Sequence, residues 1–96
     1  MNVNFLNAAE TELDEGIEYY NTQKSGLGFE FLDQVQSAVA RIKQYPDAWQ
    51  QLSRRTRRCL IKQFPYGIIY QILANEILIV VITHLHRKPD YWINRL

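Results

Sequence analysis

Residues 64–84 read FPYGIIYQILANEILIVVITH, and this stretch decides the fold. Residues 66–73 are rich in β-branched and aromatic side chains, Asn75 and Glu76 form a turn signal, and residues 77–83 are an almost continuous apolar run. Such a run is typical of a central strand that is buried on both faces. The stretch therefore predicts two antiparallel strands joined by a tight turn, with the second strand in the interior of a sheet.

Two further strands are expected beside this pair. Residues 58–64 form a candidate strand that ends before Pro65, because proline cannot donate a hydrogen bond to a strand ladder. Residues 3–6 read as a short first strand that can join at a sheet edge. The three late strands follow one another through short connections, which predicts an antiparallel meander. We therefore expect a four-stranded, mainly antiparallel sheet.

A first helix is expected directly after residues 3–6. Asn7 is a candidate N-cap, with Glu10 three residues further on as in a capping box. The helix carries one apolar stripe at intervals of three and four, formed by Ala9, Leu13, Ile17 and Tyr20. Four acidic residues lie off the stripe, namely Glu12, Asp14, Glu15 and Glu18. An acidic beginning also suits the helix dipole.

A second helix is expected over residues 27–44, and Pro46 ends it. The first helix is expected to stop at turn residues, namely Ser25, Gly26 and Gly28. Its apolar stripe is formed by Phe31, Val35, Ala38 or Val39, and Ile42. Residues 89–95 read as a short terminal helix with Pro89 in its first turn. The order β-α-α-β-β-β with a short C-terminal helix predicts an α+β fold, in which a helical hairpin packs on one face of the sheet.

Length and composition fit a single domain over residues 1–96. The lone cysteine, Cys59, excludes an internal disulfide bond and reads as a small core residue on a strand. No signal peptide is recognised at the start of the chain, so a cytoplasmic location is expected. The longest apolar segment, residues 68–82, is interrupted by polar side chains and is too short to span a bilayer, so we expect no membrane partner.

The net charge of +1 hides a strong asymmetry between the two halves of the chain. Residues 1–50 carry eight acidic and three basic side chains, a net charge of −5. Residues 51–96 carry two acidic and eight basic side chains, a net charge of +6. This pattern predicts an acidic partner for the second half, nucleic acid being the common case. The alternative is that the two halves neutralise each other in the fold.

The basic half contains two sets of candidate functional residues. Six cations are candidate contacts to phosphate or to a macromolecular target, namely Arg54, Arg55, Arg57, Arg58, Lys62 and Lys88. RNA cleavage needs a base, an acid and cationic stabilisation of the phosphate. These roles could be supplied by His84, His86, Arg87 and Tyr91, with Arg58 as a second candidate cation. The alternative is packing of Tyr91 and Trp92 on the sheet, which we favour for Trp92.

No metal or cofactor is expected. His84 and His86 could share a strand face, but no cysteine or carboxylate pair accompanies them. The glycines are scattered and match no phosphate-binding loop.

An ordered set of residues runs along the whole chain: Ala8, Glu12, Leu13, Tyr19, Tyr20, Gly28, Phe31, Pro46, Phe64, Pro65, Tyr66, Ile69, Tyr70, His84, Arg87, Pro89, Tyr91, Trp92 and Arg95. This set resembles the RelE/ParE superfamily of type II toxin–antitoxin toxins, which act in plasmid stabilisation. The resemblance implies a toxin fold that agrees with the expected order of elements. It also implies a small antitoxin whose C-terminal segment wraps the toxin. Apolar side chains of that segment would lie along the helical hairpin, and an acidic stretch would cover residues 54–58.

The superfamily divides into two activities. RelE-like members cleave mRNA on the ribosome without a metal, and ParE-like members inhibit DNA gyrase. Leu60 and Gly67 stand where the resemblance implies a catalytic lysine and a catalytic arginine, whereas Arg87 and Tyr91 match the expected cation and tyrosine. The resemblance therefore implies a ParE-like gyrase inhibitor that is not an enzyme. The alternatives are a ribosome-dependent mRNA endoribonuclease (an mRNA interferase) and an inactive remnant that still binds its antitoxin.

Overall fold

The computed structural model describes residues 1–96. Its strands are β1 (Asn2–Phe5), β2 (Gln50–Gln51), β3 (Arg57–Leu60), β4 (Tyr66–Ile72) and β5 (Glu76–His84). Its helices are α1 (Asn7–Gln23), α2 (Leu27–Gln44) and the short 3-10 helix η1 (Ile93–Arg95). The sheet order is β1-β5-β4-β3-β2, in which β1 is parallel to β5 and all other neighbours are antiparallel. The expected α+β fold is confirmed, although the sheet has five strands and not four.

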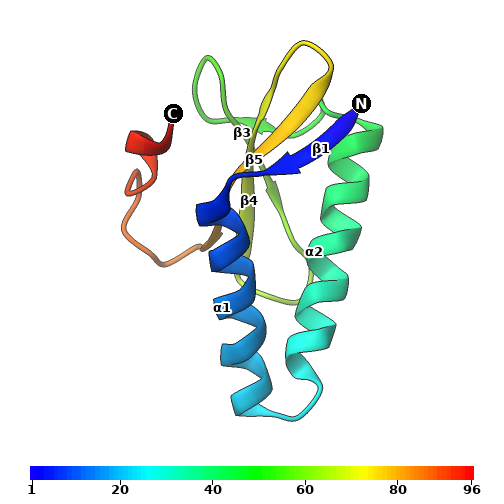
Figure 1. The fold of residues 1–96 in the computed structure, drawn as a ribbon, viewed down its shortest axis with the longest axis vertical. Coiled ribbons are helices and arrows are strands. Elements are labelled where there is room, and N and C mark those ends of the chain that lie inside the picture. The colour runs from blue at the N-terminus through cyan, green and yellow to red at the C-terminus, as the bar shows by residue number, and fades with distance from the viewer.

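The hairpin of α1 and α2 packs against the sheet, and the two helices run antiparallel (Figure 1). They approach closely at Gly28, where a Cβ atom would stand 2.1 Å from the Ile17 carbonyl oxygen. The Gly28 N–H donates to Asn21 Oδ1 at 2.7 Å. Only glycine allows this approach without displacing α1. Neither helix is both long and apolar enough to cross a membrane.

The main core lies between the helical hairpin and the sheet. The stripe predicted for α2 is buried there, as Phe31, Val35, Ala38 and Ile42. The sheet contributes Ile68, Tyr70, Ile77, Ile79 and Ile82 from β4 and β5. Cys59 is fully buried in the same core, and burial raises the pKa of its thiol. The core role expected for Cys59 is therefore confirmed.

β5 contains a β-bulge at Val80. Ile69 on β4 pairs with Val81, but the next residue, Tyr70, pairs with Ile79, so Val80 is an extra residue on β5. Before the bulge the odd-numbered side chains of β5 pack toward the helices, and beyond it the even-numbered ones do. The bulge therefore decides which face receives the side chains at the end of β5.

The strand expected at residues 58–64 ends earlier than predicted, because β3 stops at Leu60. The Ile61 N–H donates to the Tyr66 carbonyl at 3.1 Å, and Gln63 adopts a φ of 70°, so the chain turns directly after β3. The fifth strand, β2, pairs with β3 and lies in a segment for which no strand was predicted.

Two expected helix features are wrong. The N-cap of α1 is Leu6 and not Asn7, and no side chain caps the helix. The Leu6 N–H still donates to the β5 backbone at 2.9 Å, so strand pairing continues up to the first turn of α1. The helix expected at residues 89–95 is reduced to η1, because Asp90 adopts a φ of 64°, which is not helical.

Candidate functional site

Beyond β5 the chain folds back over the sheet face that is opposite the helices, as residues 85–96, here called the C-terminal segment (Figure 1). Trp92 anchors this segment. Its side chain is buried against Ile69, Val80 and Val81. The packing role expected for Trp92 is therefore confirmed, and β5 is covered on both faces as its apolar run predicts.

The carboxylate of Glu12 on α1 holds the C-terminal segment in place. Only 9 % of this side chain is exposed. The carboxylate accepts a hydrogen bond from the Tyr91 hydroxyl and two from the Arg95 guanidinium, at 2.8 and 3.1 Å. We call Glu12, Tyr91 and Arg95 the Glu12 clasp.

The clasp also binds the part of the β5 edge that has no neighbouring strand. β1 pairs with β5 only as far as Ile79, and the β5 backbone beyond it has no strand on that side. Glu12 accepts a hydrogen bond from the Ile82 N–H at 3.1 Å, and Arg95 donates one to the Val80 carbonyl at 3.1 Å. Because buried backbone groups need hydrogen-bond partners, the clasp stabilises the sheet as well as the C-terminal segment.

Sequence reasoning placed Glu12 on a polar helix face and assigned it no role of its own. Its hydrogen-bond partners lie 70 to 83 residues further along the chain, so no local pattern could reveal them. The only signal was that Glu12 belongs to the set of residues that carries the family resemblance.

The clasp raises the pKa values of Tyr91 and Arg95. Burial raises the pKa of Tyr91, and the hydrogen bond to Glu12 raises it further. The hydrogen bond to Glu12 also raises the pKa of Arg95. Both shifts favour the protonated forms, a neutral Tyr91 phenol whose proton is directed at Glu12 and a cationic Arg95.

The other residues proposed for RNA cleavage lie close to the clasp. His84 and Arg87 line a hollow of about 220 Å³ at the end of β5. The His86 N–H donates to His84 Nδ1 at 3.1 Å. The Arg87 guanidinium lies 3.8 Å from the centre of the Tyr91 ring and 3.8 Å from a Glu12 carboxylate oxygen. The structure thus gathers these four residues in one region, but it turns the Tyr91 hydroxyl to Glu12.

A larger groove of about 490 Å³ separates the C-terminal segment from the loop before β3. Four exposed apolar side chains line it, namely Leu52, Leu85, Ile93 and Leu96. Three cations line it as well, namely Arg58, Arg87 and Lys88. The lining also includes one acidic side chain, Asp90. We call it the C-terminal groove, and its character fits an apolar partner surface that carries acidic groups.

Two of the predicted cations are held by the protein itself. Arg57 donates to the carbonyl oxygens of Asp47 and Trp49 at 3.0 and 2.9 Å, and it faces the Asp47 carboxylate at 3.9 Å. Arg58 donates to Gln50 Oε1 at 2.9 Å on the edge of the C-terminal groove. Arg57 is therefore mainly a structural cation, whereas Arg58 also borders a groove.

Three other predicted cations are exposed and form no ion pair in the fold. Arg54 and Arg55 are exposed at the loop before β3 and form no ion pair. Lys62 is exposed beyond the end of β3 and lines neither the C-terminal groove nor the hollow at the end of β5.

The two histidine rings are 5.1 Å apart, but no third ligand completes a metal site. No group of three or more histidine, cysteine, aspartate or glutamate side chains is arranged to hold a metal ion.

Comparisons with known proteins identify a family and a similar fold. Residues 3–91 match the family described as ParE toxin of type II toxin-antitoxin system, parDE. Among solved structures, the chain is similar to one titled "Chromosomal ParDE TA system from P. aeruginosa", with a TM-score of 0.78 and 15 % sequence identity. That match covers 88 % of this chain and 95 % of the other, and at this identity it is a likeness of fold. No curated protein sequence matches the chain.

Proposed function

We propose a gyrase-binding function for this chain, which belongs to the ParE toxin family of type II toxin–antitoxin systems. It is a toxin, and a toxin of such a system has an antitoxin partner. We infer that the free toxin arrests growth in the cytoplasm by binding DNA gyrase, and that the antitoxin prevents this by covering the same surface. Such a pair would serve plasmid stabilisation.

The C-terminal groove is the observation that carries this proposal. Exposed apolar side chains that gather in one place mark an interaction surface on many soluble proteins. Here they are bordered by Arg58 and Lys88, whose charges would orient an acidic partner. Protein interfaces combine an apolar centre with a polar rim in this way.

The clasp favours binding over catalysis. A general acid must direct its proton at the substrate, but the Tyr91 hydroxyl donates to Glu12. A catalytic cation is most effective when its charge is unpaired, but Arg87 faces the same carboxylate. Both residues are therefore better suited to shaping the edge of the groove than to cleaving a phosphodiester.

A ribosome-dependent mRNA endoribonuclease is the second candidate. It is favoured by the hollow that His84 and Arg87 line together, and by the Arg87 side chain, which is 55 % exposed. In this mechanism His84 or His86 would be the base, Tyr91 the acid and Arg87 the cation that stabilises the phosphate.

We further propose that the antitoxin makes two kinds of contact. The helical hairpin carries three exposed aromatic side chains, Tyr19, Phe29 and Tyr45, which would bind apolar residues of the antitoxin. An acidic stretch would cover residues 54–58. A disordered antitoxin tail could fold as it makes both contacts.

Expression of the toxin without antitoxin tests the proposal, with mRNA 5′ ends and plasmid supercoiling measured in the same cells. Relaxed or broken DNA with intact mRNA would support gyrase as the target. New codon-phased mRNA ends with normal supercoiling would instead support the nuclease. Growth without any change in either readout would identify an inactive remnant.

Single substitutions sharpen this test. Arg58→Glu reverses one charge at the C-terminal groove and should weaken growth arrest more than folding. Lys24→Glu, in the turn after α1, is a charge-matched control that should leave growth arrest unchanged. Arg87→Glu should also weaken growth arrest, but it places a second carboxylate near Glu12 and so affects the clasp as well. Equal losses of soluble protein and growth arrest in Arg58→Glu would contradict the proposed contact.

A further inference from the structure

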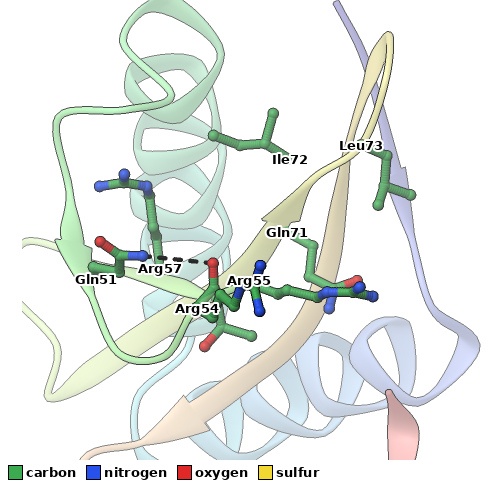
Figure 2. A pocket seen from close by; sticks show the side chains of 8 residues that line it. Gln51, Arg54, Arg55, Arg57, Gln71, Ile72 and Leu73 are labelled. Carbon is green, nitrogen blue, oxygen red and sulfur yellow. Dashed lines mark hydrogen bonds between the residues drawn. The ribbon is translucent and has the colours of Figure 1, made fainter.

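A second concave site, of about 320 Å³, lies beside the loop that precedes β3 (Figure 2). Its lining contains three arginines, two glutamines and no acidic side chain. We call residues 52–56 the arginine loop, because its exposed tip carries Arg54 and Arg55.

The arginines of this site differ in what already binds them. Arg57 is held by two carbonyl oxygens and by Asp47, as described above. Arg54 and Arg55 have no acidic partner within ion-pair distance. In Figure 2 their side chains extend toward Gln71, whereas Arg57 turns the other way. Two full positive charges therefore converge on this cavity without an anion from the chain itself.

The arginine loop is closed by its own hydrogen bonds. The N–H groups of Leu52 and Ser53 donate to the Thr56 carbonyl at 2.9 and 3.3 Å, and the Ser53 and Thr56 hydroxyls lie 2.6 Å apart. Thr56 is 1 % exposed, which fixes the base of the loop to the sheet. Because the backbone is already ordered, binding an anion at the tip has little loop-ordering entropy to overcome.

We propose that Arg54 and Arg55 form a binding site for a phosphate chain, completed by the carboxamide of Gln71. The chemistry of the lining argues for phosphate. Guanidinium and carboxamide groups offer many N–H donors, whereas the side-chain acceptors are few. A phosphodiester presents only acceptors, and arginine forks match its oxygens. The carboxylates of an acidic antitoxin stretch would compete for the same two arginines, so phosphate binding belongs to the free toxin.

The site is suited to the backbone of a nucleic acid, without readout of its sequence. No aromatic ring lines the cavity, so it offers no aromatic platform on which a base could stack. Binding should therefore be independent of sequence and strongly dependent on salt. A free nucleoside triphosphate presents the same phosphate chemistry and is the other source to be distinguished.

This site goes beyond the proposed gyrase contact. A toxin that binds gyrase through the C-terminal groove could touch the DNA held by that enzyme through the arginine loop. Phosphate binding by the isolated protein does not depend on gyrase, so the two proposals can fail separately.

The experiment measures binding of a fluorescent DNA duplex to the purified protein by anisotropy, over a range of salt concentrations. The test variant is Arg54→Ala/Arg55→Ala. The control is Lys24→Ala/Lys43→Ala, which removes the same charge from exposed positions on the helical hairpin. We expect the test variant to bind roughly tenfold more weakly at low salt, and its salt slope to fall by about 1 for each lost phosphate contact. The control should bind like the parent protein.

Competition distinguishes the ligands. Displacement of the duplex by unlabelled DNA of unrelated sequence supports the nucleic-acid backbone as the source. A nucleoside triphosphate could instead displace the duplex at a lower concentration of phosphate groups than unlabelled DNA does. That result supports a free nucleotide in the same phosphate site. The proposal is overturned if both double variants lose binding equally, if neither does, or if polyglutamate competes better than either phosphate ligand. Unchanged circular dichroism and thermal unfolding would show that Arg54→Ala/Arg55→Ala is folded.

Discussion

The Glu12 clasp and the arginine loop both present arginine side chains, but only the clasp pairs them within the fold. In the clasp, Arg95 and Tyr91 from the basic half of the chain bind a carboxylate from the acidic half. In the arginine loop, Arg54 and Arg55 find no carboxylate. Neutralisation within the fold therefore holds for the clasp, whereas the arginine loop is left unpaired, and the acidic partner predicted for it stays a prediction. Net charge alone cannot separate a cation that holds the fold from one that awaits a partner.

The two regions should respond differently to mutation. In the clasp a substitution leaves buried groups unpaired, and the free energy of unfolding falls. In the arginine loop the side chains are exposed, so a substitution changes binding and leaves stability almost unchanged. The predictions below test this contrast, from the largest expected effect to the smallest.

Glu12→Ala should have the largest effect on stability. It removes the only carboxylate that pairs with Arg95 and the acceptor for the Ile82 N–H. Removing one partner of a buried pair costs about 3–5 kcal/mol, and we expect about 3 kcal/mol here because Arg95 is 21 % exposed. Urea unfolding measures the change. Glu18→Ala, exposed on the same helix, should stay within about 0.5 kcal/mol of the parent protein. Similar values for the two variants would mean that the clasp does not stabilise the fold.

Alkaline pH should produce the next largest effect. Burial raises the pKa of Tyr70 to about 12, and the pKa of Tyr91 is raised as well. In the unfolded chain both phenols ionise near pH 10. Above that pH the unfolded chain releases protons that the folded chain retains, so the free energy of unfolding falls as pH rises toward 12. We expect Tyr70 to account for about 2 kcal/mol of this loss.

Urea unfolding at several pH values between about 9 and 12 measures the alkaline loss. Tyr70→Phe has no phenol to ionise, so its stability should depend less on pH over this window. Tyr91→Phe should remove a smaller part of the pH-dependent loss in the free energy of unfolding, the part that comes from the clasp. An unchanged pH dependence in both variants would show that these tyrosines are not the groups that titrate.

Tyr91→Phe should have a moderate effect near neutral pH. It deletes the hydroxyl that donates to Glu12 but keeps the ring beneath Arg87. Glu12 retains its bonds to Arg95 and Ile82, so the loss should be about 1.5 kcal/mol, a value typical of one hydrogen bond to a charged group. Growth arrest should persist if the target is bound and not cleaved. Complete loss of activity in a stably folded Tyr91→Phe protein would favour catalysis.

Arg54→Ala/Arg55→Ala should have the smallest effect on stability, within about 0.5 kcal/mol in urea unfolding. Both side chains are exposed and unpaired, so nothing in the fold depends on their charge. A loss as large as that of Glu12→Ala would abolish the contrast between the two regions. The same variant provides the binding test described above.

The parts of the fold that followed from local patterns were predicted well. The period of Phe31, Val35, Ala38 and Ile42 identified the buried face of α2, because a helix repeats its environment every three to four residues. The apolar run of β5 identified a strand covered on both faces. Element ends were less accurate, since the end of β3 and the start of α1 depend on backbone hydrogen bonds to β4 and β5.

The candidate site was predicted only in part. The residues after β5 were recognised because histidines, arginine and tyrosine gather there within a few positions. The sequence could not show that Tyr91 donates to Glu12, or that Arg54 and Arg55 have no ion-pair partner. The acidic group that lies nearest to a side chain in the fold can be far from it along the chain.

Residue order was therefore sufficient for the class of fold, the buried helix stripe, the central strand and the family. The folded arrangement was needed for the rest. The bulge at Val80 reverses the alternation of β5, and a period of two contains no sign of an extra residue. The clasp joins residues up to 83 positions apart, and it exists because β1 leaves the edge of β5 open where Glu12 and Arg95 meet. Local periodicity reports only which face is buried, whereas the pairing of charges depends on which surfaces the packed elements bring together.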